Sequence, residues 1–264
     1  MNRQPVVDSL AERLDTAQLT ATACAQLSDE HDLSLDEAYA VQRAVLARRV
    51  ARGERIAGVK LGFTSRAKAE QMGVSDVIIG QLSSAMLVDD GGAVDHAGLV
   101  HPRVEPEVAF RLSRTIEPGD PVPGPRAVVD AVAPALEIID SRYRDFEFDL
   151  TDVVADNTSA AHAVIAAWQD ASRPLGDLPV VLELDGRVVA TGSTDAILGD
   201  PWQAVAAAIR LAHTYGIPLP AGTVLLAGAA TEAVAVPPGA EVRARVDTLG
   251  EVTVRLRGGT DGQQ

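Results

Sequence analysis

Two glutamates two positions apart, Glu105 and Glu107, lie in a segment, residues 101–110, whose pattern predicts a β-strand. Side chains at positions i and i+2 of a strand point to the same face of the sheet, so the two carboxylates would lie side by side. Like charges that close repel each other unless a cation or a shared proton compensates them. A hard divalent metal ion bound by oxygen ligands meets that need, and Glu137 is the candidate third ligand. The alternative is that both glutamates lie on the solvated face of an edge strand.

Composition limits the class of protein. The chain has 264 residues, of which 47% are hydrophobic, enough for a large core. Its net charge of −14 would repel a nucleic-acid backbone, so no nucleic-acid partner is expected. No secretory leader or window of membrane-spanning length is recognised, so we expect no membrane association and a cytoplasmic location. The single cysteine, Cys24, excludes an intramolecular disulfide and is expected to be a small core residue of an N-terminal helix.

Residues 1–55 are predicted to form a small helical N-terminal portion. The pair Ser34 and Glu37 has the capping-box spacing that opens a helix, and Gly53 is expected to end that helix. From Ile56 the pattern changes to short β-rich runs broken by glycine. We therefore predict a metal-binding, β-rich catalytic domain over residues 56–257 and a disordered tail over residues 258–264.

Turn and helix signals divide the β-rich region. The pair Asp185-Gly186 predicts a tight hairpin, and a second hairpin is expected at 241–256. Proline at position 201 and glycine at position 216 predict a helix over 201–215. The apolar run over 128–139 is expected to be a helix that leads into a strand.

Several polar residues stand in segments where they are candidates for chemistry. Lys60 lies in an otherwise apolar strand, and the alternative is a strand-end lysine whose ammonium reaches solvent. Asp140 and Arg142 follow Glu137 and would orient it, bind an anionic substrate or form a structural salt bridge. His101 is expected at the surface, where the strand begins, rather than as a ligand.

A second polar cluster follows an acidic loop. It contains Asp156, Asn157 and Ser159, which would otherwise be interpreted as a helix cap. Capping and active-site roles do not exclude each other, so both remain open from the residues alone.

Four short segments occur in one order and carry a family resemblance: Gly58 to Ser65, the Glu105/Glu107 pair, Glu137 to Arg142, and Ala155 to Ser159. Together they resemble the fumarylacetoacetate hydrolase superfamily, in its hydratase/decarboxylase branch, over nearly the whole chain. The resemblance implies an α+β fold with a mixed β-sheet or barrel core. The segment from Met72 to Gly80 departs from the branch's pattern, which leaves the details of the substrate pocket open.

The resemblance also implies a cofactor and site residues. In that family Mg²⁺ or Mn²⁺ is held by three carboxylates, which correspond here to Glu105, Glu107 and Glu137. The catalytic residues that it implies are Lys60, Asp156 and Ser159. The substrate-binding residues that it implies are Leu61, Arg142 and Asn157.

The implied reaction is a metal-dependent decarboxylation by a carbon–carbon lyase. Its substrate is 2-oxo-3-hexenedioate, a small 2-oxo dicarboxylic acid of the meta-cleavage catabolism of aromatic compounds, and its products are CO₂ and 2-hydroxypenta-2,4-dienoate. The 2-oxo acid end of such a substrate can chelate a divalent ion. The segments over 101–107, 143–159 and 228–236 resemble the decarboxylases of the branch more than its hydratases, which favours decarboxylation over the alternative, hydration of the pentadienoate.

Two other functions are weighed against this one. One is an acylpyruvate C–C hydrolase, for which the sequence offers no obvious water-activating His-Glu pair. The other is a non-catalytic subunit of a hydratase/decarboxylase complex. The resemblance further implies a homo-oligomer and association with the partner hydratase.

Overall fold

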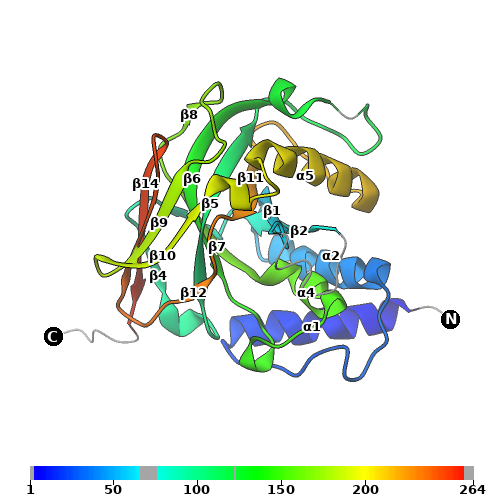
Figure 1. Cartoon of the computed structure of the whole chain (residues 1–264). Coiled ribbons are helices and arrows are strands. Elements are labelled where there is room, and N and C mark those ends of the chain that lie inside the picture. Colours follow the sequence, from blue (N-terminus) through cyan, green and yellow to red (C-terminus); the bar gives the residue numbers. More distant parts are fainter. Residues whose placement is uncertain (1–2, 66–75, 122, 259–264) are drawn as a thin grey trace.

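The computed structural model describes residues 3–65, 76–121 and 123–258. Figure 1 shows a strongly curled central sheet with helices on one side and a smaller sheet on the other. This is the α+β architecture that the sequence predicts. Within the described ranges, no helix combines the length and the apolar character needed to span a membrane.

The central sheet has nine strands in parallel and antiparallel pairs. Their order is β2-β1-β11-β5-β6-β7-β3, with β12 paired to β5 and β8 paired to β6. The strands are β1 (Ile56–Gly62), β2 (Ile78–Ser83), β3 (Leu87–Asp89), β5 (Arg103–Leu112), β6 (Val129–Ile139), β7 (Ala160–Ile165), β8 (Gln169–Asp170), β11 (Val224–Ala229) and β12 (Val234–Ala235).

The smaller sheet has the order β10-β9-β13-β14-β4 and contains both predicted hairpins. Asp185 and Gly186 join two of its strands with φ angles of 49° and 73°, which are the positive values that a tight hairpin turn requires. The strands are β4 (Ala93–Asp95), β9 (Pro179–Leu184), β10 (Arg187–Ser193), β13 (Glu241–Val246) and β14 (Gly250–Arg257).

The helices begin and end largely where the sequence predicts. The Ser34 hydroxyl accepts the Glu37 backbone N–H, and the Glu37 carboxylate accepts the Ser34 backbone N–H, so the capping box is confirmed. Gly216 ends the last helix in a left-handed conformation. The α-helices are α1 (Gln4–Leu19), α2 (Leu35–Ala51), α4 (Leu150–Ala155) and α5 (Pro201–Tyr215), and two short 3₁₀ segments near the site are η3 (Arg144–Phe146) and η4 (Asn157–Ser159).

Two local predictions are wrong. The run over 128–139 contains no helix and forms β6 instead; because β6 lies between β5 and β7 and is buried on both faces, it lacks the alternation that marks a half-exposed strand. Cys24 lies after α1 and is half-buried, and its backbone is hydrogen-bonded to Arg142 and Arg144. It is therefore not a core residue of a helix.

The central sheet packs against the smaller sheet in one hydrophobic cluster and against the helices in another. Val104 of β5 and Leu136 of β6 pack against the smaller sheet. On the helical side, Leu10 and Leu14 of α1 belong to the same cluster as residues of α2, β1, β2 and β5. The helical N-terminal portion therefore shares its core with the β-rich region, and a boundary at residue 55 stays a prediction.

Candidate metal centre

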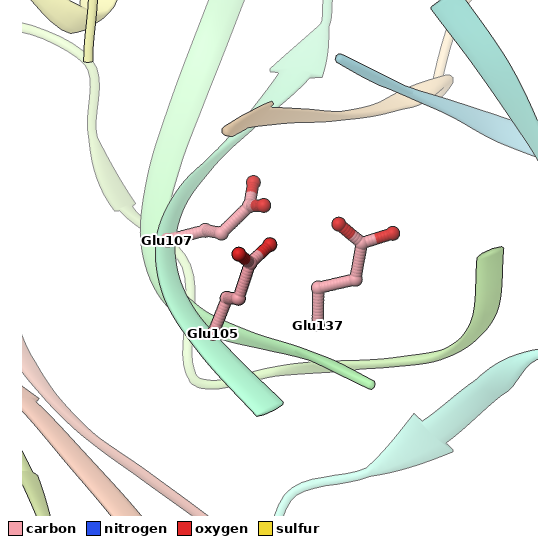
Figure 2. A group of neighbouring side chains, drawn as sticks. All are labelled: Glu105, Glu107 and Glu137. Carbon is pink, nitrogen blue, oxygen red and sulfur yellow. The ribbon is translucent and has the colours of Figure 1, made fainter. Parts of the chain in front are cut away.

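The carboxylates of Glu105, Glu107 and Glu137 converge in the curled sheet. Strands β5 and β6 pair so that Glu105 lies directly opposite Glu137, and Glu107 follows two residues along β5. Figure 2 shows the three side chains pointing toward one region. One oxygen atom from each carboxylate lies within 4.8 Å of the other two. All three residues are at most 6% exposed and β5 is an interior strand, so a solvated edge-strand face is excluded.

These carboxylates lie in surroundings that do not favour three negative charges. Burial raises the pKa of Glu107 well above its ordinary value, the charge of Glu137 adds to this effect, and Lys60 opposes it. Burial also raises the pKa of Glu137, again against Lys60. Within the part of the chain that the structure describes, Oε1 of Glu107 and Oε1 of Glu137 have no hydrogen-bond partner. The cluster therefore needs additional positive charge or protons.

A divalent ion such as Mg²⁺ or Mn²⁺ fits this cluster. The ligand atoms are all carboxylate oxygens, which such ions prefer, and two of them face the cluster without a protein donor. Glu105, Glu107 and Glu137 would hold the ion. This assignment of ligands stays a prediction.

Lys60 of β1 reaches the cluster from across the curl. Its neighbours Val59 and Leu61 belong to the main core, so strand alternation turns Lys60 to the opposite face. Its Nζ lies 3.1 Å from Oε2 of Glu137 and donates a 3.0 Å hydrogen bond to the carbonyl of Thr158. Lys60 is 4% exposed, so the alternative of an ammonium that reaches solvent does not hold.

Glu107 is held by a residue that the sequence analysis did not select, Gly228 at the end of β11. The Gly228 backbone N–H donates a 2.6 Å hydrogen bond to Oε2 of Glu107, which lowers the pKa of that carboxyl against the effect of burial. Gly228 has a φ angle of 106°, and a Cβ atom there would overlap the side chain of Thr64. The resemblance of the segment over 228–236 to the decarboxylases pointed to this region, but not to a role for the Gly228 backbone N–H.

Arg142 and Asp156 form a buried ion pair beside the cluster. The Asp156 carboxylate accepts hydrogen bonds from Nε and from the backbone N–H of Arg142. The other guanidinium donors bind the carbonyls of Asp140, Ala160 and Asp156. Burial raises the pKa of Asp156 to about 7, although Arg142 lowers it. The structure thus uses most donors of Arg142 inside the protein, which does not support its predicted contact with substrate.

The segment between this pair and Lys60 has an unusual backbone. Asn157, Thr158 and Ser159 have φ angles of 50°, 53° and 57°, a left-handed run that is costly for residues other than glycine. The Asn157 side chain pairs with the backbone N–H and C=O of Gln81 on β2. A Cβ atom on Gly80 would overlap the Thr158 side chain, so glycine permits this close approach. The run in turn places the Thr158 carbonyl against Lys60.

Two further predicted residues lie differently from the rest. Leu61 is 1% exposed within the main core, on the face of β1 opposite Lys60, and this placement does not support a substrate contact through its side chain. His101 is half-buried just before β5, and its ring packs on Phe146 with centroids 5.1 Å apart. Of the segment from Met72 to Gly80, residues 72–75 lie outside the described residues.

Comparisons with known proteins agree with the fold. The chain is 48% identical to a protein from Pseudomonas sp named 4-oxalocrotonate decarboxylase, over 96% of this chain and 98% of that relative. It is 35% identical to a 2-keto-4-pentenoate hydratase of Paraburkholderia xenovorans, over 93% of each chain. The solved structure of 4-oxalocrotonate decarboxylase from Pseudomonas putida G7, complexed with magnesium and adipate, is 37% identical and superposes with a TM-score of 0.91, over 97% of this chain and 98% of that one.

Residues 55–257, which include the three carboxylates, Lys60, the Arg142–Asp156 pair and Gly228, match the family model described as fumarylacetoacetate (FAA) hydrolase C-terminal. The sequence resemblance and this match agree, and the chain belongs to the fumarylacetoacetate hydrolase family.

Proposed function

We propose that this protein is a divalent-metal-dependent decarboxylase, a carbon–carbon lyase that converts 2-oxo-3-hexenedioate (4-oxalocrotonate) to 2-hydroxypenta-2,4-dienoate and CO₂. The observation that carries this proposal is near-full-length similarity to proteins named 4-oxalocrotonate decarboxylase, at 37–48% identity. The buried carboxylate cluster supports the metal dependence, because it has the oxygen ligands that the reaction needs. Such a reaction belongs to the meta-cleavage catabolism of aromatic compounds.

In this reaction the bond between C5 and C6 breaks, C6 leaves as CO₂, and the electron pair moves through the C3=C4 bond to the 2-oxo oxygen, which then takes up one proton. A divalent ion, when bound, supplies Lewis-acid polarisation of the 2-oxo group. Lys60 supplies a second positive charge beside that oxygen. Among the described residues, its Nζ donates to the carbonyl of Thr158 and lies 3.1 Å from Oε2 of Glu137, so we expect a further N–H to donate to the substrate oxygen.

Two buried hydroxyl groups are further candidates for contacts with the substrate. Within the described ranges, Thr158 Oγ1 and Ser159 Oγ have no hydrogen-bond partner, although both residues are 3% exposed. Buried hydroxyls without partners are costly, so we expect them to bind a substrate oxygen or an ordered water. The Arg142–Asp156 pair would position both by fixing the backbone on either side of the left-handed run.

Direct product analysis tests the proposal. Purified protein is incubated with 2-oxo-3-hexenedioate, with and without MgCl₂, while ultraviolet absorbance and CO₂ are recorded. We expect Mg²⁺-dependent release of one CO₂ per substrate consumed. Loss of substrate without CO₂ would contradict the proposal.

Hydration is the second candidate, because relatives at 34–37% identity are named hydratases. Both reactions use the same 2-oxo acid end, so the carboxylate cluster does not distinguish them. The parallel assay therefore offers 2-hydroxypenta-2,4-dienoate as the substrate. Formation of 4-hydroxy-2-oxopentanoate together with no turnover of 2-oxo-3-hexenedioate would identify a hydratase.

Replacing Lys60 with methionine should reduce turnover about 100-fold, the usual effect of losing one donor to a developing negative charge. The affinity for Mg²⁺ should not fall, because the ammonium repels a cation that binds beside it. Calorimetric titration with MgCl₂ and steady-state kinetics separate the two effects. Normal turnover of Lys60→Met would return Lys60 to a structural role.

Association with other chains stays a prediction. The proposed product, 2-hydroxypenta-2,4-dienoate, is the substrate of the hydratase that the sequence resemblance implies as a partner. A homo-oligomer, a complex with that hydratase and a cytoplasmic location are compatible with the proposal. Sedimentation of the protein with and without a purified hydratase would test the first two.

A further inference from the structure

A cation lies on the same strand face as the carboxylates. Arg103 precedes Glu105 by two residues on β5, without a register shift between them. The intervening Val104 is fully buried against the smaller sheet. Strand alternation therefore places Arg103, Glu105 and Glu107 on one face.

Burial along this face indicates where a ligand would extend. Toward the interior the face continues with Ala109 and Ala135, which are 0% exposed and belong to a packed cluster. In the other direction Arg103 is half-buried, and its partner on β12, Ala235, is exposed. The inner end is filled by side chains, so the far end of a ligand held at the carboxylates should lie toward Arg103.

Among the described residues Arg103 forms no ion pair with a carboxylate, whereas Lys60 and Arg142 are paired with Glu137 and Asp156. Its guanidinium stacks on the ring of Phe146, 4.2 Å from the centroid. Stacking of this kind orients the planar group while leaving its edge N–H donors available for a planar anion.

Phe146, the stacking partner of Arg103, has an energetically unfavourable backbone conformation. Asp145 and Phe146 have φ angles of 58° and 62°, a conformation that is uncommon outside glycine. The ring of His101 packs against Phe146 as well. Strained backbone of this kind occurs at functional sites more often than elsewhere, so its place beneath Arg103 is informative.

We infer that Arg103 binds the distal carboxylate of the substrate and thereby selects a 2-oxo dicarboxylic acid over a 2-oxo monocarboxylic acid. This inference rests on the proposed function. The carboxylates of β5 and β6 hold the 2-oxo acid end, and Arg103 receives the far carboxylate at the outer end of the same strand face. An ion pair that forms on binding and persists until the C5–C6 bond breaks contributes to KM more than to kcat.

Two saturated ligands of equal length test this role without turnover. 2-Oxoadipate and 2-oxohexanoate share the metal-chelating end and differ only in the distal carboxylate. Their dissociation constants are measured by calorimetry with MgCl₂ in excess. We expect Arg103→Met to weaken 2-oxoadipate about 10- to 100-fold, the effect of losing a charged hydrogen bond, and to leave 2-oxohexanoate unchanged. Arg103→Lys should be intermediate, because it keeps the charge but loses the planar fork.

Arg111 provides a matched control on the same strand. It also lies over an aromatic ring, that of Trp168, and it pairs with Asp130 at the far end of β5. Arg111→Met should change neither affinity. Equal weakening of both ligands by Arg103→Met, or an unchanged preference for 2-oxoadipate, would overturn the inference alone. A wild-type protein that binds neither ligand would contradict the proposed function as well.

Discussion

Glu107→Gln should remove metal-dependent turnover and at the same time stabilise the metal-free protein. Glutamine keeps an oxygen that can accept the Gly228 N–H, so the local fold should persist. It removes a buried carboxyl group whose charged form is made unfavourable by burial and by the charge of Glu137. Lewis-acid catalysis contributes several kcal/mol, so we expect turnover to fall roughly 1,000-fold or more.

The pH dependence of stability gives an independent readout. Burial raises the pKa of Glu107, so the folded protein keeps a proton that the unfolded chain releases. The stability that this proton provides is present at low pH and is lost as the pH rises through the raised pKa. The unfolding temperature of metal-free Glu107→Gln should therefore fall less steeply with rising pH than that of the metal-free wild type.

Added MgCl₂ completes the test. It should raise the unfolding temperature of the wild type, because an ion that binds only the folded state stabilises it, but should have little effect on Glu107→Gln. Glu251→Gln, an exposed change on β14, is the control and should behave like the wild type. Full activity of Glu107→Gln in MgCl₂ would exclude the proposed coordination.

The second large effect is expected for Arg142→Met. This change removes the guanidinium from a fully buried carboxylate, Asp156, and leaves three backbone carbonyls without their donor. Breaking a buried ion pair in this way costs about 3–5 kcal/mol of unfolding free energy. The exposed pair Arg111–Asp130 is the contrast, since losing it should cost no more than about 1 kcal/mol.

A double variant separates the charge from the carbonyl contacts. Arg142→Met combined with Asp156→Asn should recover a large part of the loss in denaturant unfolding, because no charge then stays uncompensated. In the single variant Arg142 no longer lowers the pKa of Asp156, so this pKa should rise above its wild-type value of about 7. The loss of stability should therefore be smaller at low pH, where Asp156 is protonated, than at high pH. If the double variant is no more stable than Arg142→Met alone, the carbonyl contacts account for the loss.

Much of the fold follows from local signals that the sequence displays directly. The capping box at Ser34, the turn at Asp185-Gly186 and the helix over 201–215 each depend on a few neighbouring residues. The run over 128–139 was assigned wrongly for a non-local reason. A strand with neighbours on both sides and a core on each face shows no alternation, so its sequence resembles that of a buried helix.

The candidate site also contains some residues that the sequence could predict and others that it could not. The convergence of Glu105, Glu107 and Glu137 could be predicted, because strand alternation acts over two residues and the resemblance supplied the third. The Gly228 amide could not, since it acts through its backbone from β11, which is remote in sequence. The substrate contact that the resemblance implies for Arg142 stays a prediction, and the sequence could not show that three carbonyls of the protein already accept hydrogen bonds from its guanidinium.

The two faces of β5 also limit which kinds of mutation this strand can accept during evolution. Val104 packs into the core on one side, while Arg103, Glu105 and Glu107 lie on the other. Deleting or inserting one residue here would exchange the faces, placing valine at the metal centre and a carboxylate in the hydrophobic core. Variation within this strand should therefore occur by point substitution, and natural insertions and deletions should accumulate in the surface loops instead.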